Sequence, residues 1–395
     1  MPARHYRADR ERTLPSNTYL DRRRVTDPTA PTAPHLRQIV SVGPHAGAHR
    51  VAIRAGVAAF IPLIVLWLLG RTDLAPVAIL ATTGAVFGRN APFLRRLTMQ
   101  LQTTSVLVVL ILAGSLASAT DAPGWAAVAA TALVAGLCSA AADLIRWAPG
   151  GCLFFVFAFA VSAHTSPGQA PLSFVAAAAV ASGVISLMVT IASGLLEGAF
   201  RRGSPKGKNA LSAPRPPLRV VSAHALTCFV AAAAAGMLSL AGGLPHPYWA
   251  MVSAIVPVVG STTVGQMTRA THRMIGTFLG LGVTGLILFY TPSGAVLIVI
   301  LALLTAATEL MVARNYGLAM LFLTPLTIGM MSLNHPQPLG PLLVDRALET
   351  CIGLAVVMVL IVVTHNVRHP VSATDQRYAP RRPGCQDTVL GAPDG

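Results

Sequence analysis

Long apolar runs separated by short polar breaks fill the chain between about residues 51 and 364. A helix needs roughly 20 predominantly apolar residues to cross a bilayer, and the pattern contains twelve candidate spans. They lie at 51–70, 74–88, 97–119, 123–145, 149–164 and 171–196, and at 220–243, 247–260, 272–290, 294–313, 315–333 and 339–364. Breaks that hold Pro and Gly mark the turns. The sequence therefore predicts an all-α polytopic membrane protein with twelve transmembrane helices.

Composition supports a membrane protein and excludes an ordinary soluble one. Charged residues make up 11% of the 395 residues, and the set AVILMFWYC makes up 54%. A soluble domain carries about 25% charged residues, and a soluble fold cannot cover its surface with so few. The net charge of +15 could indicate nucleic-acid binding. However, no run of basic and aromatic residues forms a surface on which bases could stack, so we expect a lipid bilayer and no nucleic acid as partner.

The basic residues follow the sidedness of membrane proteins. If the N-terminus lies inside, twelve spans place almost every basic connection on the cytoplasmic side, in agreement with the positive-inside rule. We expect a multi-pass protein of the cell membrane, inner or plasma, with both termini in the cytoplasm. The predicted parts are a disordered tail (1–50), a first six-helix repeat (51–200), a basic linker (201–219), a second six-helix repeat (220–365) and a C-terminal tail (366–395).

The two halves resemble each other. Asp143 ends the fourth span and Glu309 ends the tenth, 166 residues later, while Arg54 in the first span corresponds to His224 in the seventh. Six spans is an even number, so both halves enter the membrane in the same sense. The pattern predicts parallel repeats related by a pseudo-twofold axis along the membrane normal.

The second and eighth spans are too short to cross as straight helices, and a polar break with glycine follows each. Paired short segments at matching positions are typical of a transporter's midplane site. The alternative is a short helix buried by its neighbours, followed by an amphipathic interfacial segment.

Three motifs in the second half carry a resemblance. They are Pro247-Tyr248-Trp249-Ala250, Arg273-Met274-Ile275-Gly276-Thr277-Phe278-Leu279-Gly280 and Arg346-Ala347-Leu348-Glu349-Thr350-Cys351-Ile352-Gly353. In this order, the series YWA, RxxGTxxG and RxxxTxxG resembles the fusaric acid resistance-like (FUSC) family, also called the aromatic acid exporter family, across about 220–365. The resemblance implies an inner-membrane transporter with two six-helix halves that exports aromatic carboxylic acids. Plant malate channels carry a similar membrane domain, so a channel is an alternative.

Charged residues inside the last span are candidates for the transport site. Arg346 and Glu349 are three residues apart and share a helix face, and Asp345 lies beside them. One interpretation is a local ion pair. In the other, Arg346 binds a substrate carboxylate and Glu349 or Asp345 takes the coupling proton. A guanidinium is suited to bind a carboxylate because its planar fork matches the two carboxylate oxygens and it stays charged.

Two further candidates for substrate binding come from the second half. Arg273, at the predicted start of the ninth span, is either a snorkelling anchor or an entry point for anions. Gly276 and Gly280 follow it at a spacing that favours close helix packing. Tyr248 and Trp249 are either part of an aromatic belt at the membrane interface or a stacking surface for an aromatic substrate.

Asp143 and Glu309 are candidates for proton coupling at matched span ends. Each is either an interfacial residue or part of a gate or proton relay that is symmetric between the repeats. His224 could titrate near neutral pH, although a satisfied packing histidine is the alternative.

Enzymatic signatures are missing from the sequence. It holds no phosphate-binding loop, no nucleophile motif and no CxxC or Cys/His cluster among its five cysteines. We therefore expect no enzyme, no cofactor and no metal site. The predicted function is a secondary transporter, proton-coupled, for efflux of aromatic or other organic carboxylic acids. An organic-anion channel and a non-transporting membrane scaffold are the alternatives, and a homo-oligomer is left open.

Overall fold

The structure is a computed structural model, which describes residues 39–375 apart from residues 46, 90, 121, 165–169, 201–215, 261, 291–293 and 334–337. Most of the predicted N-terminal tail, most of the predicted linker and the last 20 residues, including Cys385, lie outside the described residues.

Every regular element in the described part is helical, and its twelve α-helices correspond one for one to the predicted spans. They are α3 (Ala48–Leu68), α4 (Ala75–Thr82), α5 (Phe93–Ser118), α6 (Gly124–Ile145), α7 (Leu153–His164), α8 (Leu172–Phe200), α9 (Leu218–Ala241), α10 (Pro247–Val258), α11 (Thr263–Tyr290), α12 (Gly294–Met311), α13 (Tyr316–Ser332) and α14 (Leu339–Asp375). The 3₁₀ turns η1 (Thr72–Leu74) and η2 (Thr83–Val86) extend α4 at its two ends. The prediction of an all-α fold is confirmed.

Eight of these helices are long and apolar enough to cross a membrane, and four apolar helices are shorter. The short ones are Thr72–Val86, α7, α10 and α13. The 12 residues of α10 extend about 18 Å, less than the ~30 Å hydrocarbon core. The prediction that the second and eighth elements are short is confirmed. The fifth and eleventh elements, α7 and α13, are short as well, which the sequence analysis did not predict.

The short helices lie inside the bundle. Every residue of α4 and of α10 is buried, and α10 packs against α7, α9, α11 and α14. A helix that is buried on all sides needs no polar face toward solvent, and α4 and α10 are accordingly apolar all round. The aromatic residues Tyr248 and Trp249 and the polar Ser253 of α10 therefore lie in the interior of the protein.

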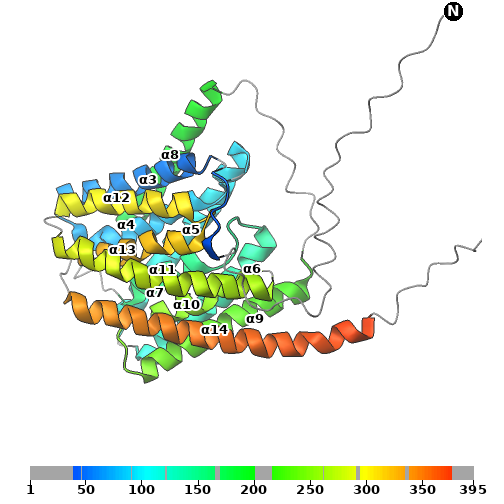
Figure 1. Cartoon of the computed structure of the whole chain (residues 1–395). Helices are drawn as coiled ribbons and strands as arrows, with labels where there is room; N and C mark the ends of the chain where they lie inside the picture. Colours follow the sequence, from blue (N-terminus) through cyan, green and yellow to red (C-terminus); the bar gives the residue numbers. More distant parts are fainter. Residues whose placement is uncertain are drawn as a thin grey trace, which may run out of the picture.

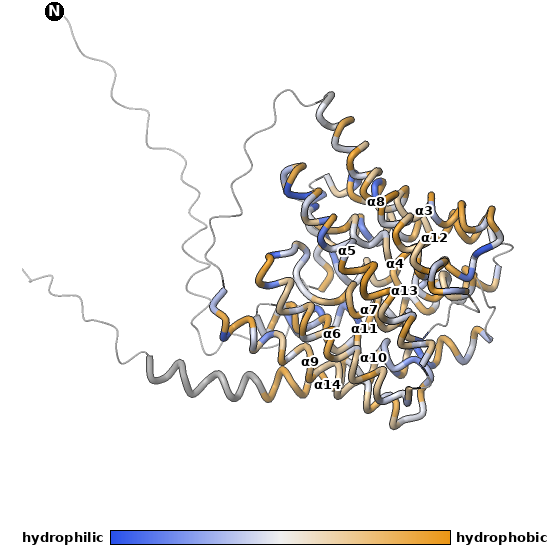
Figure 2. The backbone as a smooth tube through the Cα atoms, turned by 180° about the vertical axis from the view of Figure 1, so that it is seen from behind, coloured by the Kyte–Doolittle hydropathy of each residue, from blue (hydrophilic) through white to orange (hydrophobic). Residues whose placement is uncertain are grey.

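Most of the helices run roughly side by side, α14 extends past the rest of the bundle at one end, and the end of α8 projects from its side (Figure 1). Figure 2 shows hydrophobic residues along most of the length of the helices. At the end past which α14 extends, the connection after α4 contacts the connection after α6, with the Gly88 amide 2.6 Å from the Ala148 carbonyl oxygen. We call this end the basic end because it carries Arg50, Arg54, Arg89, Arg95, Arg96, Arg146, Arg219, Arg269 and Arg314.

Helix contacts recur between the halves. In the first half α5 packs against α7 and α8, and six helices later α11 packs against α13 and α14. Across the halves, α3 packs against α12, and α6 packs against α9. Six helices separate α3 from α9 and α6 from α12. If these helices are matched in pairs, the contact α3–α12 corresponds to the contact α9–α6.

Glycines allow the closest of these helix contacts. A Cβ atom on Gly276 of α11 would collide with the carbonyl oxygen of Gly317 on α13, and one on Gly280 would lie 2.7 Å from the Thr324 Cβ atom. The packing interpretation of the glycine spacing is confirmed.

Candidate functional site

The first turn of α10 places two aromatic rings in the interior, near the end of the bundle opposite the basic end. Tyr248 and Trp249 are both 0% exposed. The interpretation as an aromatic belt at the membrane interface is therefore wrong, because neighbouring helices cover α10 on all sides. Histidines on two other segments complete the cluster: the His164 ring centroid lies 5.2 Å from that of Tyr248, and the His246 ring stacks on Trp249 at 4.9 Å.

Arg346 reaches this aromatic cluster from α14. Its guanidinium carbon lies 4.6 Å from the centroid of the Trp249 ring, within the range of a cation–π interaction. The side chain is 1% exposed, and its Nε and Nη1 atoms are buried without a hydrogen-bond partner. A guanidinium in this environment has donors available for an acceptor that the described residues do not supply.

Glu349 lies one helical turn further along α14, but it does not pair with Arg346. The described residues hold no ion pair between these two side chains, so the interpretation as a local pair is wrong. Instead Glu349 Oε1 accepts a 3.0 Å hydrogen bond from the backbone amide of His246, and Ser239 Oγ lies 3.5 Å away. The Oε2 atom is buried and has no partner.

Asp345 lies at the edge of the cluster. One of its carboxylate oxygens is 4.0 Å from His246 Nδ1, and about a fifth of its side chain is exposed. His246 precedes α10, outside the membrane-spanning helices. Burial is the main cause that lowers the pKa of His246, Asp345 opposes this effect, and His164 and Arg346 add to it. His246 is therefore neutral at pH 7 and adds no positive charge beside Glu349.

Arg273 approaches the same short helix from α11. It donates from Nε to Ser253 Oγ at 3.1 Å and from Nη1 to Tyr316 Oη at 3.1 Å, while Nη2 is buried without a partner. Ser253 in turn donates to the Trp249 carbonyl oxygen at 2.7 Å. The snorkelling interpretation is wrong: α11 begins at Thr263 rather than near residue 272, so Arg273 lies well inside the helix and is 1% exposed.

These residues form one site with surplus positive charge. We call it the Arg346 site and define it by Arg346, Arg273, Glu349, Trp249, Ser253 and His246. The site holds two buried guanidinium groups and a single buried carboxylate, and atoms of all three charged side chains lack hydrogen-bond partners. Charged groups inside a membrane protein are costly and mark functional sites. An anion with two acceptor oxygens would satisfy the vacant guanidinium donors and balance the charge.

The other two acidic candidates lie at the basic end, away from the Arg346 site. Glu309 is buried, and its Oε2 accepts from Arg89 Nη2 at 2.6 Å. Asp143 Oδ2 lies 2.7 Å from His224 Nδ1. Each pair joins the two halves of the chain, because Arg89 and Asp143 belong to the first half and their partners to the second. Both matched acidic residues therefore contact a residue of the other half, but their partners occupy different positions: His224 corresponds to Arg54 in the repeat, whereas Glu309 binds Arg89.

Several residues of the site were missed by sequence reasoning. Ser239, Ser253 and Tyr316 are single polar residues in apolar helices, which no motif distinguishes from ordinary packing residues. His246 was missed because its contacts with Glu349 and Trp249 depend on how the connection before α10 folds back over α14. Its place two residues before Tyr248 was the one available signal.

The comparisons with known proteins agree with this architecture. Residues 230–360 match a family model described as fusaric acid resistance protein-like. The match includes all six residues of the Arg346 site, and it confirms the resemblance of the second half. A curated relative, the uncharacterized membrane protein YvaC of Bacillus subtilis (strain 168), is 40% identical over 91 residues. That alignment covers 23% of this chain and only 14% of the relative. No solved structure matches the chain.

The fold and the comparisons together define a class. The chain is a multi-pass membrane protein. The part of its second half that is similar to the fusaric acid resistance protein-like family, residues 230–360, includes the site described above.

Proposed function

We propose that this protein is a secondary transporter of the cell membrane that exports aromatic or other organic carboxylic acids. One observation carries the proposal: the buried Arg346, held over Trp249, keeps two donors without a partner while a second buried arginine faces the same helix. A carboxylate offers two oxygens to such donors, and guanidinium–carboxylate pairs are strong and directional. The match to the fusaric acid resistance-like family supports a transport role.

The rings around Arg346 support an aromatic substrate. Tyr248 lies 5.6 Å from Trp249 and 6.3 Å from Phe157 between ring centroids, in edge-to-face arrangements. Aromatic pairs in this geometry are more favourable than their buried area alone predicts. A substrate ring that entered beside them would gain the same contacts, whereas an aliphatic acid would gain only apolar burial.

Glu349 is our candidate for proton coupling. Its Oε2 atom is buried and unpartnered, on the same helix face as Arg346. When the substrate anion occupies the arginine, a proton on Glu349 removes the repulsion between the two carboxylates. When the substrate leaves, Glu349 can ionise and balance the arginine. Alternation between these states would exchange protons for organic anions. Asp345, Glu309 and Asp143 are further candidates along the proton path.

The helix contacts support two parallel six-helix repeats, with the basic end in the cytoplasm. A twofold rotation that swapped the halves would exchange the contact α3–α12 with α6–α9, and the contact α5–α7 with α11–α13. The arginines gathered at one end of the bundle give the orientation by the positive-inside rule. Both termini then lie in the cytoplasm, and substrate moves from the basic end to the Arg346 site.

A susceptibility profile tests the transport function. A strain that lacks the chain is grown with a panel of aromatic and aliphatic carboxylic acids, and is complemented with the wild type, with Arg346→Gln or with Arg71→Gln. We expect the strain without the chain to be hypersensitive to a subset of aromatic acids. The wild type and Arg71→Gln should restore growth, since Arg71 pairs with Asp73 outside the site, and Arg346→Gln should not.

Two outcomes would contradict the proposal. Equal growth on every acid with and without the chain would remove the evidence for efflux. Full rescue by Arg346→Gln, together with loss of rescue when residues 1–38 are deleted, would favour a scaffold that acts through its tail.

A further inference from the structure

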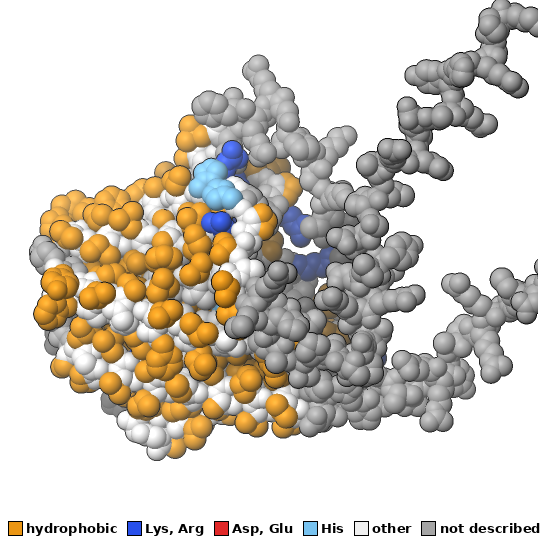
Figure 3. Space-filling view, viewed as in Figure 1, with side chains coloured by type: hydrophobic (Ala, Val, Ile, Leu, Met, Phe, Trp, Pro, Cys, Tyr) orange, Lys and Arg blue, Asp and Glu red, His pale blue; other side chains and the backbone are white. Residues whose placement is uncertain are grey.

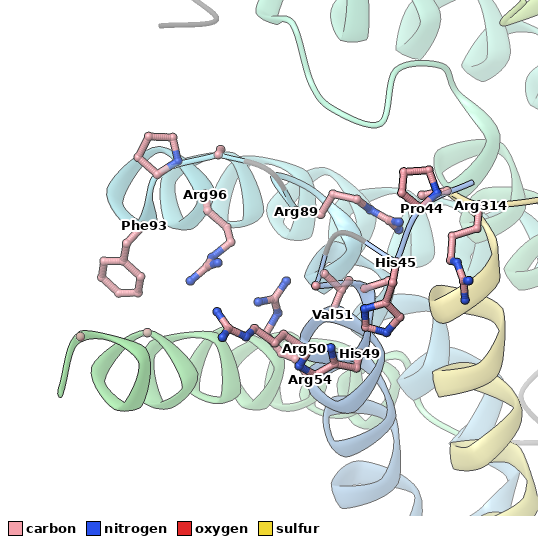
Figure 4. Close-up of a pocket in the computed structure, with 17 residues that line it drawn as sticks. Pro44, His45, His49, Arg50, Val51, Arg54, Arg89, Phe93, Arg96 and Arg314 are labelled. Atoms are coloured by element: carbon pink, nitrogen blue, oxygen red, sulfur yellow. The ribbon is translucent and has the colours of Figure 1, made fainter. Parts of the chain in front are cut away.

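The segment that leads into α3 crosses to the second half of the chain at the basic end. Residues 39–45 belong by sequence to the predicted N-terminal tail, and we call them the strap. The Gly43 amide donates to the Arg314 carbonyl oxygen at 2.9 Å, and Arg314 Nε donates to the Gly43 carbonyl oxygen at 3.1 Å. In Figure 4 Pro44 of the strap lies beside Arg314. These two hydrogen bonds fix the strap to the connection between α12 and α13.

Two buried side chains of the second half also bind the strap. Asn315 Nδ2 donates to the carbonyl oxygens of Ile39 and Ser41 at 3.0 and 3.1 Å. His272 Nε2 lies 2.9 Å from the Ile39 carbonyl oxygen, and it is the donor because a carbonyl oxygen can only accept. Asn315 and His272 are 7% and 8% exposed. A buried donor that loses its acceptor costs more than the bond contributes, so the strap is part of the folded basic end.

The side chains that hold the strap are the sequence neighbours of the bond between Arg273 and Tyr316. His272 precedes Arg273 on α11, Asn315 precedes Tyr316 at the start of α13, and Arg273 Nη1 donates to Tyr316 Oη at 3.1 Å. A Cβ atom on Gly317 would lie 3.2 Å from atoms of both His272 and Asn315, so these two side chains are close together. Both helices run away from the basic end. The strap therefore joins α11 to α13 on the basic-end side of Arg273.

The other end of the strap borders an opening that we call the basic pocket. This pocket has a volume of about 840 Å³, and Pro44 and His45 form part of its wall. Its arginines are Arg50, Arg54, Arg89, Arg96 and Arg314. Figure 3 shows basic and histidine side chains at this end beside a largely hydrophobic surface. One part of the strap thus faces an opening at the basic end, and the other part is bonded next to Arg273.

We propose that the strap is a latch that keeps the basic end closed over Arg273 and must release before an organic anion can enter from the cytoplasm. Transporters work by alternating access, so the end of the bundle that admits substrate has to open. The strap connects α3 to the α11–α13 pair, and these helices cannot separate at the basic end while its bonds are formed. The inference rests on the proposed function, in which substrate reaches the Arg346 site from the basic end.

The bonds of the strap are few enough to be reversible. Five hydrogen bonds between described residues hold it to the second half. One hydrogen bond changes the balance between two states by roughly two- to tenfold. Loss of several of them therefore shifts the protein measurably toward the state in which the basic end is open.

The test measures how fast a buried thiol of the full chain reacts with a small charged methanethiosulfonate reagent in detergent. The five native cysteines are replaced by alanine, and Thr277→Cys places the thiol one turn beyond Arg273, where the native side chain is 0% exposed. The latch is weakened by His272→Phe combined with Asn315→Ser, which removes three of the five bonds. Serine keeps an oxygen that can cap α13, as Asn315 Oδ1 does with the Leu318 amide at 3.1 Å. We expect the thiol to react about tenfold faster or more than with the native latch.

Matched variants separate opening of the basic end from a general loosening of the bundle. His272→Gln keeps a side-chain donor and should react at the rate of the native latch. A second reporter, Ser239→Cys, lies near the opposite end of the bundle on α9, where the native residue is also 0% exposed. Its thiol should react no faster when the latch is weakened. If the double variant does not fold, Asn315→Ser alone should raise the rate at Thr277→Cys by about two- to tenfold.

Two results would overturn the proposal. The first is an unchanged reaction rate at Thr277→Cys in the latch variants, and the second is an equal rise at Thr277→Cys and Ser239→Cys. The reaction needs no substrate, so the latch can fail while the export proposal stands. A confirmed latch in a chain that changes growth on no acid would instead contradict the export proposal alone.

Discussion

Arg346 on α14 and Trp249 on α10 meet in the interior of the protein, with 4.6 Å between the guanidinium carbon and the ring centroid. The two residues come from segments nearly 100 residues apart, and α10 is buried along its whole length. The ring stabilises the cation without using an acceptor atom, so the Nε and Nη1 donors stay available. This relationship makes a buried arginine both stable enough to persist and ready to bind an anion.

Trp249 should be essential for the packing of this region. Because its ring is completely buried, Trp249→Ala should reduce the free energy of unfolding by about 3–5 kcal/mol, and Trp249→Phe by clearly less. Trp125→Ala is the control, since that residue is 57% exposed near the start of α6. Thermal unfolding of the three variants in one detergent checks the order. Equal losses for Trp249→Ala and Trp125→Ala would contradict the buried position.

The close contact between α11 and α13 gives a second prediction. Gly276→Ala places a methyl group against the Gly317 carbonyl oxygen, and the backbone cannot move aside as a side chain could. We expect a loss of about 1–3 kcal/mol in stability. Gly282→Ala on the same helix meets nothing within 4 Å and should change stability little. If the two variants unfold alike, the predicted helix contact is absent.

Arg89 and Glu309 should be energetically coupled across the halves. A double-mutant cycle with Arg89→Gln and Glu309→Gln measures the coupling, because each single variant leaves the other charge without its partner. For a buried pair the loss on breaking it is about 3–5 kcal/mol, whereas an exposed pair contributes at most about 1 kcal/mol. The pair Arg71 and Asp73, which is more exposed, is the matched comparison. A coupling at Arg89–Glu309 no larger than at Arg71–Asp73 would argue against a buried cross-half ion pair.

His246 should make stability depend on pH. Its folded-state pKa is lowered, chiefly by burial, so below about 6.5 the unfolded chain binds a proton that the folded chain does not. Stability is therefore fully present above that pH and falls as the pH is lowered. His246→Gln should flatten the slope of unfolding temperature between pH 7.5 and 5 relative to the wild type. If His246→Gln keeps the wild-type slope of unfolding temperature against pH, another group causes the pH dependence of stability.

The fold could be predicted from the sequence wherever the length of an apolar run determines the position and length of a helix. The short second and eighth elements followed from that pattern. The short α7 was not predicted, because the span was begun at Pro149, although Pro149, Gly150 and Gly151 are turn residues and the helix starts only at Leu153. The start of α11 at Thr263 was missed for the opposite reason. Its first turns are polar and contain glycine, and they are helical although their sequence is typical of a loop.

Four of the six residues of the Arg346 site could be predicted from the sequence, but Ser253, His246 and the contacts within the site could not. Spacing on one helix brought Arg346 and Glu349 together, but it could not show that Trp249 would take the place of Glu349 beside the arginine. That contact depends on the packing of α10 against α14. The basic pocket was not found at all, since its arginines are scattered from residue 50 to residue 314 and only the tertiary fold gathers them.

Flux through the purified protein in liposomes tests the anion site most directly. Liposomes loaded with a radiolabelled aromatic acid are given a proton gradient, and the initial rate is compared for the wild type, Arg346→Gln and Arg71→Gln at matched protein content. We predict saturable, gradient-dependent flux in the wild type and in Arg71→Gln, and a rate at least about tenfold lower in Arg346→Gln. Flux in Arg346→Gln equal to that of the wild type would contradict the assignment of the Arg346 site.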